Sequence, residues 1–383
     1  MAGVVIAVFI FNMSEFIPIG LLTGISEDFG ISESSAGLII SVYAWAVAIL
    51  SLPMMLLLKK MEFRRMLLLS IALFTVFQFA SGVATGYGML VVSRLGVAAA
   101  HAIFWSIAPN LAIRVVSERY RRVALSMVAV GTSIAMIVGL PVGRVIGLAL
   151  GWRMAFLVIA AVAVATLVLI LVVFPHLENP GTFTLKRLPE IFRNRTLVCI
   201  YVVLAIYITG CYTGYSYIEP FLQQVGGLDD LVITVALVVF GLAGFIGSSL
   251  FARMYEGHRC TFLLYGFIGT SVSLLLMRSL GPYLLGALVV CTIWGALHTC
   301  FNTAYQNETL RAASEDAGPI AMSLFSGIYN VGIAMGPIVG GLVIDNLGMD
   351  LIGYAGSIFT LTALVIAALV LVPRLRAGED RSV

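Results

Sequence analysis

Residues 154–174 read MAFLVIAAVAVATLVLILVVF, an apolar run with a single hydroxyl side chain and no charge. About 20 such residues in helical form cross the hydrocarbon core of a bilayer. Backbone groups in lipid must be hydrogen-bonded within their own segment, and this run is too long and too continuous for a barrel strand. The stretch therefore predicts a transmembrane helix.

Similar runs recur along the whole chain of 383 residues. The predicted spans are residues 4–26, 36–58, 66–86, 89–112, 124–148, 154–174, 197–218, 231–252, 262–279, 283–305, 319–343 and 350–372. Hydrophobic residues make up 61% of the chain and charged residues only 11%, whereas soluble domains carry about 25% charged residues. This composition excludes a cytosolic enzyme, a disordered chain and a collagen-like fibre, and a net charge of +3 gives no sign of a nucleic-acid partner.

The basic residues predict the orientation of these spans. Most of them occupy loops on one side: Lys59, Lys60, Arg64, Arg65, Arg114, Arg119, Arg121, Arg122, Lys186, Arg187, Arg193, Arg195, Arg253, Arg259, Arg311, Arg374, Arg376 and Arg381. The opposite loops hold only Arg153 and Arg278, while Arg94 and Arg144 lie within spans. The positive-inside rule places the basic side, and with it both termini, in the cytoplasm. No cleavable signal peptide is visible, and the chain begins almost inside an apolar run, so we expect that its native start is missing.

The two halves of the chain resemble each other at an offset near 197 residues. Gly131-x7-Gly139-x-Pro141-x-Gly143 matches Gly332-x3-Gly336-Pro337-x2-Gly340, and Leu150-Gly151 matches Leu347-Gly348. Ala100-His101-x2-Phe104 matches Leu297-His298-x2-Phe301. Such parallel repeats are typical of transporters built from two six-helix halves. We therefore predict an all-α membrane protein of twelve helices in two pseudo-symmetric bundles, residues 1–174 and 197–383, joined by a cytoplasmic linker at 175–196.

Several motifs resemble those of the major facilitator superfamily, in particular its twelve-span drug:proton antiporter group. Gly139-Leu-Pro-x-Gly-Arg144 resembles the fifth-span motif of its exporters. His101-Ala-Ile-Phe-Trp105 and Tyr215-Ser-Tyr-Ile-Glu-Pro220 closely resemble bacterial sugar efflux transporters that export arabinose and thiogalactosides. One departure lies at residues 56–65, where the basic pair Arg64-Arg65 of a loop motif survives but its glycine and aspartate do not. Glu62 is a possible substitute for that acid.

Three residues within spans are predicted to couple protons to transport. Glu15 lies well inside the first span, where a carboxylate costs several kcal/mol unless it is paired, solvated or protonated. His101 and Arg94 share one stripe of the fourth span with Trp105, and histidine changes charge in the physiological range. Arg94 also resembles an arginine that the superfamily associates with proton transfer. The alternatives are a fixed structural hydrogen bond for Glu15, a neutral helix-bonding His101, and an ion pair or headgroup contact for Arg94.

Sugars need aromatic surfaces for their C–H faces and polar partners for their hydroxyls. The predicted substrate-binding residues are Asn12, Tyr43, Trp45, Trp105, Tyr212, Tyr215, Glu219, His298, Asn302 and Asn330. For Tyr212 and Tyr215 the alternative is the interfacial aromatic belt, and for Glu219 the outer rim of the protein. His298 has no carboxylate nearby, so we favour substrate binding or structural bonding there over proton coupling.

Small residues and prolines mark spans five and eleven as a pair that packs closely and bends or slides during transport. The residues concerned are Gly139, Pro141, Gly143, Arg144, Gly336, Pro337 and Gly340. Tight static packing explains the same residues equally well. Arg144 is unusual in such a ridge and is expected to face a cavity or to reach a carbonyl or carboxylate.

These features predict a proton-coupled antiporter that exports small sugars by alternating access, with no cofactor. The resemblance implies a bacterial inner membrane, and a complete two-half pathway in each chain implies a monomer. Export of hydrophobic or cationic drugs is the alternative, because one buried carboxylate could serve a cation as well as a proton. An enzyme is not expected, since HExxH, GxSxG and phosphate-loop motifs are missing, and a channel is disfavoured by the repeat. The five cysteines form no CxxC, so neither a metal site nor a disulfide is expected.

Overall fold

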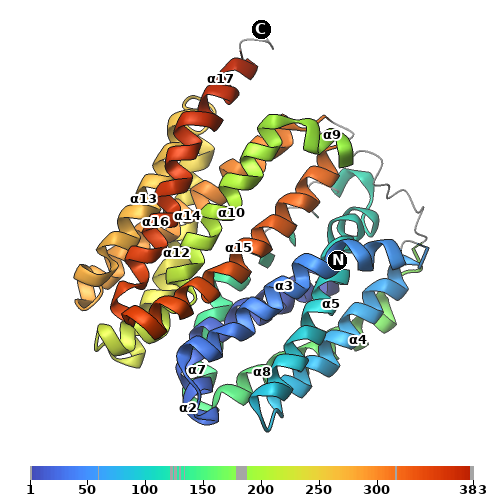
Figure 1. Ribbon diagram of the computed structural model, residues 1–383. Helices are drawn as coiled ribbons and strands as arrows, with labels where there is room; N and C mark the ends of the chain where they lie inside the picture. The colour runs from blue at the N-terminus through green and yellow to red at the C-terminus, as the bar shows by residue number, and fades with distance from the viewer. Residues whose placement is uncertain are drawn as a thin grey trace. The chain divides into compact units, whose positions relative to one another are not determined.

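The computed structural model describes residues 2–58, 60–120, 124, 127–128, 131–132, 134–177, 188–314 and 317–379. Within those residues every regular element is a helix (Figure 1). The chain divides into two compact units, Met1–Phe183 and Thr184–Val383. Residues 178–187 of the expected linker and five of the basic loop residues lie outside the described part. These five are Lys59, Arg121, Arg122, Lys186 and Arg187, and Arg381 of the tail lies outside it as well.

The helices of the N-terminal unit follow the predicted spans closely. They are α1 (Ala2–Phe16), a 3-10 segment (Ile17–Gly20), α2 (Leu22–Phe29), α3 (Glu33–Leu58), α4 (Phe63–Gly82), α5 (Tyr87–Arg114), a 3-10 turn (Glu118–Tyr120), a π-helical turn (Ala135–Gly139), α7 (Leu140–Leu150) and α8 (Trp152–Val173). The first predicted span, 4–26, was expected as one helix but breaks after Phe16. Pro18 lies in the 3-10 segment, and proline lacks the N–H that a continuing helix needs.

The C-terminal unit repeats this order. Its helices are α9 (Leu188–Arg193), α10 (Arg195–Tyr215), α11 (Ile218–Pro220), a π-helical turn (Phe221–Val225), α12 (Asp230–Met254), α13 (Arg259–Leu280), α14 (Leu284–Ala312), α15 (Gly318–Leu347), a 3-10 turn (Met349–Leu351), α16 (Ile352–Ile366), a π-helical turn (Ala367–Leu371) and α17 (Val372–Glu379).

Eleven helices of the described residues are long and apolar enough to cross a membrane, and a shorter apolar helix spans Ile137–Leu150. The shorter helix belongs to the predicted fifth span, 124–148, of which several N-terminal residues lie outside the described part. The prediction of an all-helical, multi-span membrane protein is therefore confirmed.

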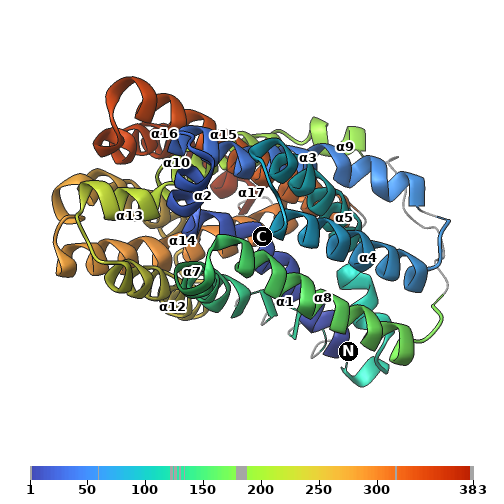
Figure 2. The same ribbon diagram turned by 90° about the horizontal axis from the view of Figure 1, so that it is seen from below.

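Helix packing is the same in the two units. In the first unit α4 packs on both α5 and α8, as Figure 2 shows from below, and α3 packs on α5. In the second unit α13 packs on both α14 and α16, and α12 packs on α14. Gly151 and Gly348, which match in the sequence repeat, both have positive φ, 87° and 106°. Only glycine adopts such angles readily, so the repeat has a structural basis at these two turns.

The small-residue ridges of the repeat pack on the first long helix of their own unit. A Cβ atom on Gly139 would lie 3.0 Å from Met13, and one on Gly143 would lie 2.3 Å from Ile17. In the second unit, a Cβ atom on Gly336 would lie 2.4 Å from Cβ of Tyr212. The ridges therefore bring α7 against α1 and its 3-10 extension, and α15 against α10, at distances that a side chain would prevent.

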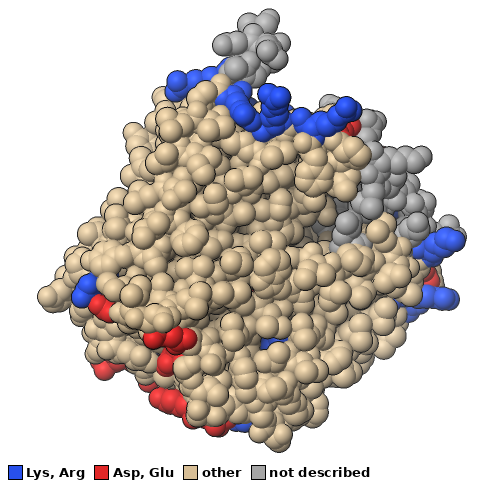
Figure 3. All heavy atoms as spheres, in the orientation of Figure 1, with Lys and Arg blue, Asp and Glu red and all other residues tan. Residues whose placement is uncertain are grey.

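Charged side chains separate toward the two ends of the helices. In Figure 3, Lys and Arg gather beside the C-terminal α17, and Asp and Glu gather at the opposite edge of that unit. The two arginines on the acidic side each pair with a carboxylate. Arg153 lies 2.7 Å from Asp28, and Arg278 lies 2.8 Å from Asp350. Arg153 and Arg278, the two arginines that the sequence places in loops opposite the basic side, are thus each paired with an acid.

Candidate functional site

Glu15 and His101 lie side by side in the core of the N-terminal unit. Glu15 is the second-last residue of α1, just before the 3-10 break, and His101 lies in the middle of α5. The Glu15 Oε2 atom is 3.8 Å from His101 Nε2, and the two side chains are 9% and 6% exposed. At this distance the two groups form an ion pair when the imidazole is protonated and the carboxylate is ionised.

Tyr43 of α3 forms a hydrogen bond with the other nitrogen of the His101 ring. Its hydroxyl lies 2.7 Å from His101 Nδ1. When the hydroxyl donates to Nδ1, the neutral ring carries its proton on Nε2, the atom that faces Glu15. In that tautomer, the Nε2 proton of His101 faces the carboxylate.

Arg94 of α5 anchors the chain immediately before Glu15. Its guanidinium donates to the Ser14 hydroxyl at 3.0 Å and to the Ser14 carbonyl at 2.7 Å, and it lies 4.5 Å from the centre of the Tyr43 ring. Arg94 is 1% exposed, which excludes the alternative of a lipid headgroup contact. Arginine, carboxylate, imidazole and phenol thus form one buried cluster drawn from α1, α3 and α5.

Two members of this cluster were missed by the sequence analysis. The Ser14 hydroxyl donates to Gln78 Oε1 of α4 at 2.9 Å, and both side chains are fully buried. Serine is common in membrane helices, so Ser14 gave no signal in the sequence. The amide of Gln78, in the third predicted span, was a usable signal. Polar groups at that depth need a partner.

The remaining predicted residues of the first unit lie at different distances from the cluster. Trp105 is half-buried, with its ring centre 6.1 Å from that of His101. Asn12 is buried on α1 and donates to the Val8 carbonyl of its own helix at 2.8 Å. Trp45 lies two residues beyond Tyr43 on α3, and residues at that spacing do not share a helix face. The structure thus brings Trp105 to the cluster but not Trp45.

His298 is the centre of a second cluster, within the C-terminal unit. Its Nδ1 atom lies 3.4 Å from the Cys211 sulfur, and its Nε2 atom lies 3.1 Å from the Tyr329 hydroxyl. Trp294 donates its indole N–H to the same sulfur at 3.2 Å. No carboxylate takes part in these contacts, in contrast to the His101 cluster. Cys211 and Tyr329 were not among the predicted residues, because a thiol and a tyrosine in apolar helices carry no distinct signal.

The tyrosines of α10 pack inside the unit. Tyr212 is 2% exposed, with its ring centre 5.6 Å from that of Tyr215. The Tyr215 ring stacks on Phe240 at 4.7 Å. Burial excludes the interfacial aromatic belt for Tyr212. Glu219, expected at the rim if not at the site, is 2% exposed, so the rim alternative is wrong for this residue.

Two asparagines of the second unit differ in how well they are bonded. Asn302 is half-buried and accepts a hydrogen bond from Gln306 at 3.1 Å. Asn330 of α15 is buried and donates to the Ser326 carbonyl at 3.0 Å. Its Oδ1 atom is buried and has no hydrogen-bond partner among the described residues. That oxygen is a ready acceptor for a hydroxyl donor.

Arg144 forms a hydrogen bond with the backbone, and Pro141 and Pro337 lie within the regular helices α7 and α15. Arg144 is 1% exposed and donates to the Gly20 carbonyl at 3.1 Å, so it reaches a carbonyl, one of the expected alternatives. Pro141 lies at the start of α7, and Pro337 lies inside α15, where its carbonyl accepts the Tyr217 hydroxyl at 2.8 Å.

Charged loops close each unit at the basic end. In the first unit, Glu62 lies 2.8 Å from Nδ1 of His176, which follows α8, and Arg64 lies 2.7 Å from the other ring nitrogen. In the second unit, Glu308 binds Arg259 at 2.7 Å and accepts the Tyr255 hydroxyl. Burial raises the pKa of Tyr255, and the hydrogen bond to Glu308 raises it further. These contacts tie the loop 60–62 to the end of α8, and the loop 255–258 to the end of α14.

Two bundles of long apolar helices, each with a buried polar cluster, define a multi-pass membrane transporter. The family model of the Major Facilitator Superfamily matches residues 4–318, and the chain therefore belongs to that superfamily. The protein is a transporter and not an enzyme.

Solved structures of transporters share this fold. A crystal structure of a peptide transporter POT in complex with sulfate matches with a TM-score of 0.77 and 13% identity, covering 98% of this chain and 94% of that chain. A POT family transporter in complex with 5-aminolevulinic acid matches with a TM-score of 0.76 and 13% identity, covering 97% and 95%. A bacterial homolog of the human lysosomal transporter Spinster, inward-facing and occupied, matches with a TM-score of 0.71 and 15% identity, covering 99% and 96%. At these identities the likeness concerns the fold alone.

Proposed function

We propose that the protein is a proton-coupled antiporter that exports small sugars, such as arabinose and thiogalactosides, by alternating access. The observation that carries the proposal is the Glu15 carboxylate, buried in an apolar unit 3.8 Å from His101. An intramembrane ionisable residue of this kind is the usual mark of a proton path. We further propose that it works as a monomer in a bacterial inner membrane, with both termini in the cytoplasm.

The proton site would be Glu15 with His101 and Arg94. Protons from outside would load Glu15 and His101 and favour outward release of the sugar, and their loss to the cytoplasm would reset the carrier. Proton and sugar need not touch, because each must only bind one conformation more tightly than the other. Arg94 donates to the Ser14 hydroxyl and carbonyl, and would hold the end of α1 in place beside the proton site.

The candidate sugar contacts are polar and aromatic groups, and those of each unit are given separately. Trp105 and Tyr215 offer apolar ring surface, and the free Oδ1 of Asn330 offers an acceptor. The other candidates are Asn12, Trp45, Tyr212, Glu219, His298 and Asn302, whereas Tyr43 is assigned to the proton site because its hydroxyl contacts His101. The fold is shared with peptide transporters at 13% identity, so that likeness does not bear on the substrate.

A multidrug:proton antiporter is the second candidate, and the same carboxylate favours it. A buried carboxylate can attract a lipophilic cation directly as well as carry a proton. Counterflow in proteoliposomes separates the two candidates: liposomes preloaded with unlabelled arabinose, a thiogalactoside or a lipophilic cation are diluted into trace labelled compound. Saturable uptake of a sugar supports sugar export. Uptake of the cation alone would replace it with drug export, and unsaturable flux would indicate a channel.

We expect Tyr43→Phe to lower proton-driven sugar efflux by about tenfold, because a buried His101 nitrogen left without its partner costs about 1–3 kcal/mol. Counterflow at a fixed pH should change much less. The measurement is efflux from loaded proteoliposomes with and without an imposed pH gradient. Equal losses in both assays would mean that the hydroxyl serves sugar binding or folding instead.

We expect His298→Gln to weaken sugar binding and to leave proton coupling intact, the reverse of what we expect for Tyr43→Phe. Proton coupling should survive, because this ring contacts no carboxylate in the part of the chain that the structure describes. The sugar concentration for half-maximal counterflow should rise by about tenfold, the effect of losing roughly one buried hydrogen bond of about 1–2 kcal/mol. A loss of pH-driven transport with unchanged sugar affinity would contradict the assignment.

A further inference from the structure

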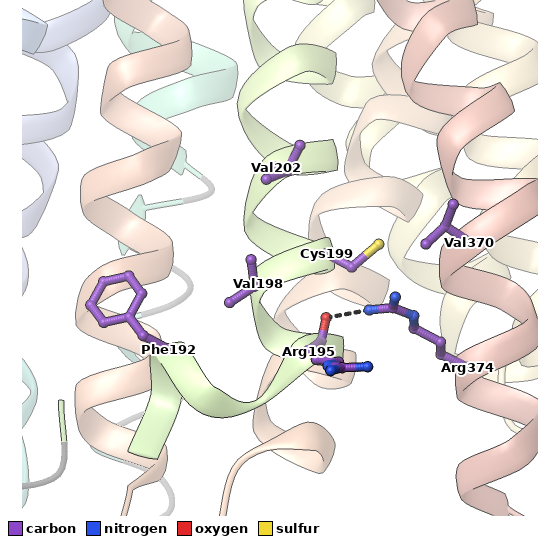
Figure 4. Close-up of a pocket in the computed structure, with 7 residues that line it drawn as sticks. All are labelled: Phe192, Arg195, Val198, Cys199, Val202, Val370 and Arg374. Carbon is purple, nitrogen blue, oxygen red and sulfur yellow. Dashed lines mark hydrogen bonds between the residues drawn. The ribbon is translucent and has the colours of Figure 1, made fainter. Parts of the chain in front are cut away.

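A pocket of about 300 Å³ lies at the surface of the C-terminal unit, at the basic end of its helices. Its walls come from α9, from the start of α10, from the π-helical turn that follows α16, and from the start of α17 (Figure 4). The lining consists of Phe192, Arg195, Val198, Cys199, Val202, Val370 and Arg374. None of these residues belongs to the Glu15 or His298 cluster.

The pocket has a charged mouth and an apolar floor. Arg195 is the first residue of α10 and Arg374 lies in α17, just beyond the π-helical turn, while the three valines lie further along the helices toward their apolar middle. Arg374 donates to the Arg195 carbonyl at 2.8 Å, which holds its guanidinium at the mouth. Among the described residues, neither arginine forms an ion pair with a carboxylate.

The apolar walls are open to the outside of the bundle. Val202 is 48% exposed and Val370 is 37% exposed, and both lie in segments that are long and apolar enough to span the membrane. Phe192, at the mouth, is 58% exposed, and aromatic rings favour the level of lipid headgroups. Free phosphate does not need such walls, whereas a phospholipid needs both the cations and the apolar surface.

We propose that this pocket binds one anionic phospholipid, with its phosphate between Arg195 and Arg374 and an acyl chain along the three valines. Arginine pairs with phosphate oxygens through two parallel N–H donors. Basic pockets between transmembrane helices recognise anionic lipid headgroups in this way. The site lies apart from both clusters, so it stands whether or not sugar is the substrate.

The test is lipid retention. Wild-type protein is extracted from vesicles of equal parts POPG and POPC, and the bound lipids are counted by native mass spectrometry. Two arginines near an anionic headgroup, at about 1 kcal/mol each, predict a preference for POPG of about thirtyfold. Arg195→Gln/Arg374→Gln should remove most of it. Arg195→Gln alone leaves the backbone carbonyl that Arg374 binds, so it should weaken retention without disturbing the pocket.

The matched control is Arg119→Gln/Arg253→Gln, which removes two exposed arginines outside the pocket and should keep the preference. Equal retention of POPG and POPC by the wild-type protein would overturn the proposal. So would a preference that survives in the double pocket variant or is lost equally in the control. Excess inorganic phosphate should not displace POPG, and displacement would reassign the pocket to free phosphate.

Discussion

Replacing Glu15 with glutamine is expected to abolish proton-driven sugar accumulation while sugar counterflow continues. Glutamine keeps the shape and one carbonyl oxygen of the side chain but cannot take up a proton. With one proton exchanged per sugar, a pH difference of about one unit sustains about a tenfold sugar gradient. In Glu15→Gln that gradient should collapse to about onefold, and the measurement is the steady-state sugar ratio across proteoliposomes at imposed pH differences.

Glu27→Gln is the matched control, because Glu27 is an exposed acid of α2. It should keep the gradient of the wild-type protein. Coupling that persists in Glu15→Gln would remove this carboxylate from the mechanism. Loss of counterflow for a cation alone would instead assign Glu15 to direct substrate recognition.

The second large effect is expected from Gly336→Ala. A Cβ atom there would lie 2.4 Å from Cβ of Tyr212, 2.6 Å from its carbonyl carbon and 2.9 Å from the Thr213 nitrogen. Two of these atoms are backbone, so α15 must move away from α10. Overpacking of this kind costs about 1–3 kcal/mol or more, and we expect a loss of most counterflow together with a lower thermal unfolding midpoint in detergent.

Gly327→Ala provides the comparison within the same helix. A Cβ atom at Gly327 meets nothing within 4 Å, and alanine is a better helix former than glycine by about 1 kcal/mol. This variant should therefore retain transport and be at least as stable as the wild-type protein. Similar behaviour of the two variants would show that the α10–α15 contact is not as tight as its geometry indicates.

The fold was largely predictable because lipid imposes a simple rule. A run such as residues 154–174 has to form a helix, and the structure gives α8 at Trp152–Val173. The break of the first span after Phe16 was less visible. Pro18 marked it, but proline inside a membrane helix is often tolerated when neighbouring groups satisfy the backbone. Here Arg94 and Arg144 bind the backbone carbonyls of Ser14 and Gly20, on either side of the break.

The site was predictable where a residue type is unusual at membrane depth. Glu15, Arg94 and His101 stand out by their charge or titration alone, and the structure brings them together. Gln78 offered a signal as an amide in a membrane span, but its partner Ser14 did not, because the two residues lie on different helices and are 64 positions apart in sequence. Cys211 and Tyr329 were missed for the same reason. Partners across helices follow from packing, which a single sequence does not reveal.

The most direct test of proton antiport is the sign of the pH change that a sugar gradient produces. Proteoliposomes contain a pH-sensitive dye, potassium and valinomycin clamp the membrane potential, and the sugar identified by counterflow is added outside. Antiport predicts that sugar entering drives protons out, so the lumen becomes alkaline, and that Glu15→Gln shows no change. Acidification of the lumen would indicate symport, and sugar entry without any pH change would contradict proton coupling altogether.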